Sequence, residues 1–146
     1  QKERDKVVKE KEEALRKARM METSEEALHR LYEPIFRQLW DMEFANLHNT
    51  NPFRIVIDAS NCAAMGCPDY AEIIEVPMNL TYIKEKVNGK KYETLQEFFE
   101  DVKLLISNAL LYNSDPNNEY HKAANFLKKK FQKMGEKVLN EVQQQL

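Results

Sequence analysis

The side chains best suited to bind a ligand are one asparagine and two tyrosines that lie among apolar residues. Asn113 follows Tyr112 at the end of the most apolar helical run, and Tyr70 lies in an apolar stretch punctuated by prolines. A side-chain amide beside apolar residues can donate a hydrogen bond to a ligand carbonyl. An asparagine at the end of a helix can equally serve as its cap, and buried tyrosines can be core aromatics with solvated hydroxyls. Composition alone leaves both interpretations of Asn113 open.

Catalytic chemistry has no comparable support. The sequence contains no P-loop, GxGxxG, HExxH, GxSxG or CxxC pattern. The histidines His29, His48 and His121 are scattered, with no carboxylate or nucleophile in a defensible arrangement. Cys62 and Cys67 have no further Cys or His nearby to complete a zinc site, so we interpret them as reduced structural thiols. We therefore expect no enzyme, no metal site and no cofactor.

Length and charge bound the class of protein. The 146 residues suit one domain, and no apolar run approaches the length of a membrane helix. The first residue is Gln, which suggests a piece of a longer protein. The net charge of −2 gives no global basic field for nucleic acid. Residues 51–80 hold one basic and four acidic residues, and residues 111–121 hold two acidic and no Lys or Arg. Such acidity favours basic ligands, or it is ordinary loop acidity.

Apolar periodicity predicts four helices and no strand, hence an all-α bundle. Capping boxes begin the first and third helices, with Thr23 and Thr94 as N-caps. Gly89 suits a left-handed position after the second helix. The first helix is expected from Ser24 to Phe44 or slightly beyond, with Pro34 kinking or restarting it. The second is expected from Met78 to Val87, the third from Thr94 to Tyr112, and the fourth starts at Pro116-Asn117-Asn118.

Two further segments frame these helices. Residues 1–22 contain 14 charged residues and predict a solvated, charged helical lead-in or linker, which leaves 23–146 as the bundle. Residues 47–77 form a long irregular stretch that is rich in both prolines and large apolar residues. A loop of this length is usually functional, and a ligand wall is a natural use for its apolar side chains. We interpret the run Lys128–Lys130 as a solvated face rather than a nuclear localisation signal.

Four motifs together resemble a bromodomain. They are Asn51-Pro52-Phe53, Ile57-Asp58-Ala59, the P-D-Y-A-E-I-I-E-V-P-M-N-L block of residues 68–80, and Tyr112-Asn113. The resemblance covers roughly residues 24–139, and the start of the fourth helix is most similar to the acetyltransferase-associated members. It implies a left-handed four-helix bundle that binds acetyl-lysine at one end.

The resemblance also implies a role for each site residue. The amide of Asn113 would donate to the acetyl carbonyl, and Tyr70 would reach the same carbonyl through an ordered water. The other implied members surround the acetyl group: Pro52 and Phe53 in the shelf, Ile57 on the wall facing the methyl, Met65 and Cys67 in the loop, Tyr112 before the asparagine, and Tyr120 as gatekeeper at the start of the fourth helix.

The sequence departs from the family pattern at three places. Asn51 replaces the tryptophan of the commonest shelf, so we expect a less hydrophobic outer mouth and a weaker grip. The loop of residues 59–66 is longer than in many members. The loop after Asn113 is one residue longer than in similar members, which makes Glu119 a competing gatekeeper that would give a more acidic rim.

The implied function is recognition of acetylated lysine, on histone tails or other acetylated proteins, in chromatin and transcription regulation. We expect a nuclear, monomeric domain within a larger chromatin protein, with no membrane and no direct nucleic acid required. The alternative is a helical protein–protein interaction scaffold with a degenerate pocket. An acetyltransferase catalytic domain fits less well, because no acetyl-CoA loop is visible in the sequence.

Overall fold

A computed structural model describes residues 1–144, and in this range the regular secondary structure is helical, apart from one isolated bridge between Phe44 and Thr50. The predicted all-α class is confirmed. None of the described helices is long and apolar enough to cross a membrane. The elements are α1 (Lys2–Met20), α2 (Ser24–Asp41), the 3₁₀ turns η1 (Ala45–Leu47) and η2 (Pro52–Arg54), α3 (Tyr70–Ile73), α4 (Leu80–Asn88), α5 (Leu95–Tyr112) and α6 (Glu119–Gln144).

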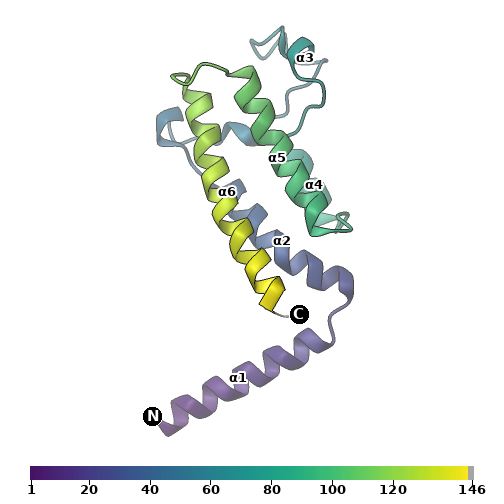
Figure 1. Cartoon of the computed structure of the whole chain (residues 1–146), viewed down its shortest axis with the longest axis vertical. Helices are drawn as coiled ribbons and strands as arrows, with labels where there is room; N and C mark the ends of the chain where they lie inside the picture. The colour runs from purple at the N-terminus through teal and green to yellow at the C-terminus, as the bar shows by residue number, and fades with distance from the viewer. Residues whose placement is uncertain (145–146) are drawn as a thin grey trace.

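The helices α2, α4, α5 and α6 pack against one another as an elongated bundle (Figure 1). The α2–α4 loop, which contains α3, lies at one end of this bundle, and α1 projects from the other end. No residue of α1 is buried, as expected for a charged, solvated lead-in. The treatment of residues 1–22 as a separate segment stays a prediction.

Local caps set several helix bounds. Thr23 Oγ1 accepts a hydrogen bond from the Glu26 N–H, and Thr94 Oγ1 accepts one from the Glu97 N–H, both at 3.1 Å. These contacts confirm the two predicted N-caps. Pro34 lies inside α2 without dividing it.

Other predicted bounds were wrong by a few residues. The helix α2 ends at Asp41 because the chain turns extended at Met42, and the Phe44 N–H then donates to the carbonyl of Thr50 at 2.9 Å. The helix α6 begins at Glu119 rather than Pro116, since Asn118 Oδ1 caps it by accepting from the Tyr120 N–H at 2.7 Å.

The second helix also differs at both ends. Asn79 Oδ1 accepts from the Tyr82 N–H at 2.8 Å, so Asn79 caps α4 and the helix begins at Leu80 rather than Met78. The left-handed residue after α4 is Lys90, with φ of 50°, whereas Gly89 has φ of −86°. Glycine was therefore wrongly assigned to that position.

Aromatic rings close the bundle at the end remote from the α2–α4 loop. The rings of Tyr32 and Phe98 stack at 5.3 Å, and Tyr92 meets both of them edge-on. The Tyr92 hydroxyl donates to Asp101 Oδ2 at 2.7 Å, and Lys86 Nζ lies 2.9 Å from the same oxygen. Burial raises the pKa of Tyr92 far above its ordinary value, and the bond to Asp101 adds to the shift. This closure holds α2, α4 and α5 together, and it leaves the opposite end free to form a site.

Candidate ligand-binding site

A cavity of about 390 Å³ opens where the α2–α4 loop covers the ends of α5 and α6. All nine residues singled out by the family resemblance line this single cavity: Pro52, Phe53, Ile57, Met65, Cys67, Tyr70, Tyr112, Asn113 and Tyr120. No Asp, Glu, Lys or Arg is among the described residues that line it. The cavity is therefore an uncharged slot with apolar walls and a few amide and hydroxyl groups.

The α2–α4 loop owes its shape to its own hydrogen bonds. Asp58 Oδ1 accepts from the backbone N–H groups of Ser60 and Asn61 at 2.9 and 3.1 Å, and from the Ser60 hydroxyl. The Ser60 hydroxyl is the main cause of a lowered pKa at Asp58. Asn61 Nδ2 donates to the carbonyl of Val56 at 2.8 Å. These contacts bend the loop so that Ile57 and Met65 both reach the cavity.

Contacts to the helices then place the loop over the bundle end. Thr81 on α4 donates its hydroxyl to the carbonyl of Arg54 at 2.6 Å. Asn108 on α5 donates Nδ2 to the carbonyl of Val76 at 2.8 Å. Phe53, which is buried, packs edge-on against Phe44 with ring centroids 5.4 Å apart. These contacts hold the loop residues that line the slot against α4 and α5.

The two tyrosines of the slot form a pair tied to the loop. The rings of Tyr70 and Tyr112 lie 5.1 Å apart at 57°. The Tyr112 hydroxyl donates to Asp69 Oδ1 at 2.6 Å, and this bond is the main cause of a pKa of about 12 for Tyr112. Burial raises the pKa of Tyr70 as well as that of the Cys67 thiol. Both groups are accordingly neutral at physiological pH, and the slot stays uncharged.

Asn113 both caps α5 and lines the slot. Its Nδ2 donates to the carbonyl of Ala109 at 3.0 Å, one turn back in the helix. A primary amide carries two N–H groups, so this bond leaves a second donor. The backbone carbonyl of Asn113 lies 2.7 Å from Nδ1 of His121 on α6, a contact that requires the Nδ1-protonated imidazole. Sequence reasoning missed this role of His121, which no spacing motif could reveal.

Asn79 is a further polar lining residue that sequence reasoning did not select. It is 4% exposed, and its Nδ2 has no hydrogen-bond partner among the described residues. Sequence reasoning did not select Asn108 either. It lies at helical spacing from Leu105 and Tyr112 on the lining face of α5. A polar residue interrupting an apolar helical face is the signal that could have found Asn108. The other lining residues missed were Ile55, Gly66, Met78, Leu105 and Ala109.

Asn51 lies outside the slot, and the weaker grip expected from the missing shelf tryptophan stays a prediction. Its side chain is 8% exposed and does not line the cavity. Its Nδ2 donates to the carbonyls of Leu39 and Trp40 at 2.9 and 3.1 Å, and its Oδ1 accepts from the Phe53 N–H at 3.1 Å. Asn51 therefore anchors the loop to the end of α2, and the mouth is left to Ile55, Met65 and Tyr120, each about half exposed.

The structure also distinguishes the two gatekeeper candidates. Tyr120 lines the slot, whereas Glu119 does not. The Glu119 carboxylate accepts from Asn46 Nδ2 at 2.9 Å and lies 3.2 Å from Lys122 Nζ. The bond from Asn46 is the main cause of a lowered pKa at Glu119. Glu119 thus connects η1 to α6 outside the slot.

Comparisons with known proteins identify the family. The bromodomain family model matches residues 36–125. The chain is 36% identical over 110 residues, 74% of its length, to a bromodomain-containing protein of Dictyostelium discoideum. It is 32% identical over 70% of its length to transcription factor GTE1 of Arabidopsis thaliana, and 32% identical over 58% to the SWR1 complex bromodomain subunit bdf1 of Schizosaccharomyces pombe. These matches span only 7%, 24% and 14% of the respective relatives. The chain belongs to the bromodomain family.

Proposed function

We propose that this bromodomain binds acetylated lysine side chains, with acetylated histone tails as its ligands. The observation that carries the proposal is the uncharged slot that joins Asn113, Tyr70 and the apolar loop residues. The matched relatives include, by name, a transcription factor and a bromodomain subunit of the SWR1 complex. A nuclear location and a place within a larger chromatin protein are parts of the same proposal.

The slot selects acetyl-lysine mainly by rejecting free lysine. Burial of an ammonium group without a partner costs several kcal/mol, and no carboxylate among the described residues lines the slot to offset this cost. Acetylation removes the charge, adds a methyl group for the wall at Ile57, and leaves one carbonyl that needs a donor. The second N–H of Asn113 supplies that donor, and leaving a buried carbonyl unpaired would cost roughly 1–3 kcal/mol.

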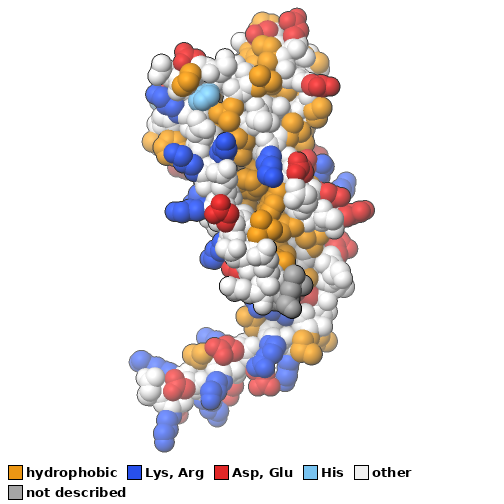
Figure 2. Space-filling model, viewed as in Figure 1, with side chains coloured by type: hydrophobic (Ala, Val, Ile, Leu, Met, Phe, Trp, Pro, Cys, Tyr) orange, Lys and Arg blue, Asp and Glu red, His pale blue; other side chains and the backbone are white. Residues whose placement is uncertain are grey.

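The acidic residues beside the slot suit a basic tail. Asp69, Glu72 and Glu75 lie on or next to α3 at the bundle end, where acidic side chains gather at the top of the molecule in Figure 2. They would attract Lys or Arg residues that flank the acetylated position, without entering the slot. A single small headgroup buries little area, so we expect weak binding that depends on other modules of the full protein.

Calorimetric titration with acetylated and unacetylated histone peptides tests the proposal. Asn113→Ala, and Asn113→Phe to fill the slot, should abolish binding of the acetylated peptide. Asn117→Ala is the matched control, because Asn117 is exposed in the adjoining loop. Since Asn113 also caps α5, circular dichroism must show that each variant is folded. Unchanged affinity in a folded Asn113 variant would refute the mechanism.

Tyr70→Phe provides an independent readout. It removes only the hydroxyl, and thus the proposed water-mediated contact, so affinity should fall less than in the Asn113 variants. The alternative of a scaffold with a degenerate pocket predicts no acetyl-dependent binding even in the wild-type domain. The absence of a shelf tryptophan at position 51 still supports this alternative, although Asn51 itself does not line the slot. A peptide array would then identify the acetylated site that binds best.

A further inference from the structure

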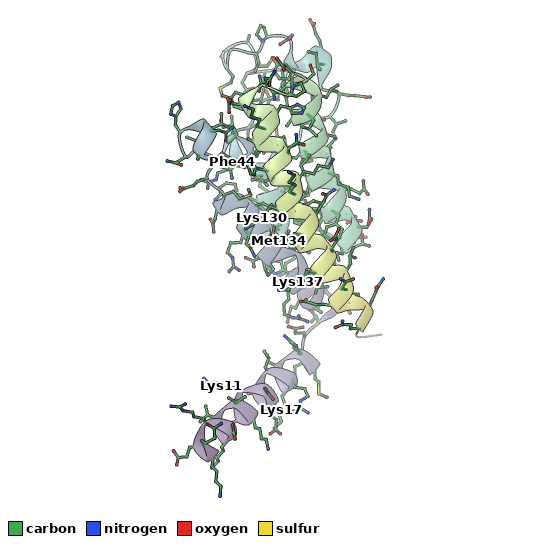
Figure 3. All side chains as sticks on the ribbon, turned by 60° about the vertical axis from the view of Figure 1, so that its left-hand side comes forward. Lys11, Lys17, Phe44, Lys130, Met134 and Lys137 are labelled. Atoms are coloured by element: carbon green, nitrogen blue, oxygen red, sulfur yellow. The ribbon has the colours of Figure 1, made fainter. Side chains whose placement is uncertain are left out.

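The outward face of α6 carries an unusual concentration of lysines. With 3.6 residues per turn, five lysines fall within an arc of about 100°, along about 22 Å of helix. Phe126 lies inside the same arc and is 62% exposed. We refer to this surface as the α6 lysine face: Lys122, Phe126, Lys129, Lys130, Lys133 and Lys137, all exposed. Figure 3 labels Lys130 and Lys137 on successive parts of it.

Most lysines of this face have no ion-pair partner among the described residues, although Glu136 and Glu141 lie on the same helix. Among the described residues, Lys122 pairs with Glu119, but no ion pair involves the other four lysines. Lys129, Lys133 and Lys137 repeat at i, i+4, a spacing at which like charges destabilise a helix. The solvated faces of α1 and α2 differ, since they place Glu13 with Lys17 and Glu33 with Arg37. Solvation alone does not require like charges at this spacing, because alternating charges would solvate the helix without the repulsion.

The total charge of the chain conceals this segregation. The helix α6 contains six lysines and three glutamates, whereas residues 51–80, which include much of the slot, hold one basic and four acidic residues. In Figure 2 basic side chains lie down the left part of the bundle over α6, and acidic side chains gather at the top and right. The net charge of −2 is therefore a poor guide to what α6 can bind.

We infer that the α6 lysine face binds the phosphate backbone of double-stranded DNA. Duplex DNA presents one negative charge per about 1.7 Å of its axis, so it can meet every lysine along this straight face at once. A membrane surface fits less well, because the face offers only one large apolar side chain, Phe126. Backbone contacts of this kind are independent of base sequence, and they require neither Asn113 nor the slot.

The position of the face relative to the slot suits a chromatin ligand. The helix α6 begins at the slot, where Tyr120 lines the mouth, and the lysine face continues from there toward the other end of the bundle (Figure 1). A histone tail in the slot and adjacent DNA on α6 would thus meet surfaces of opposite charge. Simultaneous binding of a histone tail and DNA rests on the proposed acetyl-lysine function. DNA binding by α6 does not, and it can be tested separately.

Fluorescence anisotropy with a labelled short duplex, titrated with the full chain at several salt concentrations, tests the inference. We expect weak binding that is the same for two unrelated sequences, and a log–log salt slope near −0.9 for each phosphate neutralised. The variant Lys129→Gln/Lys133→Gln/Lys137→Gln should reduce the slope by about 2.7 and the low-salt affinity by at least about tenfold. Circular dichroism confirms that it is folded.

A second triple variant provides the control. Lys90→Gln/Lys91→Gln/Lys103→Gln changes the net charge equally on exposed residues outside α6, and it should retain the wild-type slope and affinity. Equal weakening by both variants, or no binding by the wild type at low salt, would overturn the inference. Polyglutamate at equal charge concentration could also displace the labelled duplex, with binding that depends on the same α6 lysines. That result would identify an acidic protein segment as the partner and would also overturn the inference.

Discussion

Replacing Asn51 by alanine should lower the free energy of unfolding by about 2–6 kcal/mol, because it leaves two buried backbone groups without a partner, at about 1–3 kcal/mol each. The variant removes the partners of the Leu39 carbonyl and the Phe53 N–H, which belong to residues 0% and 8% exposed. The Trp40 carbonyl also loses a bond but keeps one from Arg54 Nε at 2.8 Å. Such a loss is a large part of a typical domain stability of about 5–15 kcal/mol.

Urea denaturation followed by circular dichroism measures this change. Asn117→Ala is the control, since its exposed side chain makes no hydrogen bond within the described chain, and it should shift stability by less than about 0.5 kcal/mol. If Asn51 belonged to the mouth of the slot, Asn51→Ala would weaken peptide binding and leave stability nearly unchanged. A loss of stability below about 1 kcal/mol would refute the anchoring role, given the two orphaned groups.

Three further predictions concern the helices and the slot. Gly135→Ala should stabilise the protein by about 0.5–1 kcal/mol, because Gly135 lies within α6 and the nearest atom to an added Cβ is 3.7 Å away; a lower melting temperature would contradict this. Asn79→Ala should cost about 1 kcal/mol in urea denaturation through loss of the α4 cap. Asn79→Ser introduces no charge and keeps an oxygen that can accept from the Tyr82 N–H, so it should lose less; equal losses would exclude capping as the cause. The pKa of Tyr112 is raised to about 12, mainly by its bond to Asp69. The stabilisation from this bond is therefore present below the ordinary tyrosine pKa of about 10 and is lost as the pH rises toward 12. Asp69→Asn should reduce that alkaline loss in unfolding measurements between pH 9 and 12, and identical pH profiles would argue against the bond.

Local sequence determined much of the fold. Thr23 and Thr94 supply oxygens that cap the following helices wherever the rest of the chain lies, so their positions could be predicted. Apolar periodicity likewise indicated which faces of α5 and α6 would be buried. Helix ends were less predictable, because the end of α2 depends on the Phe44–Thr50 bridge and the start of α6 on whether Asn117 or Asn118 acts as the cap.

The residues of the slot could be named from motifs, since their order along the chain carries the family pattern. Their contacts could not, because they join distant segments. The bond between Tyr112 and Asp69 spans 43 residues, and that between Asn108 and Val76 spans 32. Neither has a signature in the local sequence, although both help to place the loop that makes the slot.

The sequence by itself determined the helices, the apolar loop and the identity of the side chains that meet at the bundle end. Only the tertiary structure decided where each polar group points. Asn51 turns toward α2 rather than the mouth, and Asn113 donates one N–H to a carbonyl of its own helix. The physical reason is that a hydrogen-bonding side chain takes the partners that packing brings within reach, and packing depends on the whole chain.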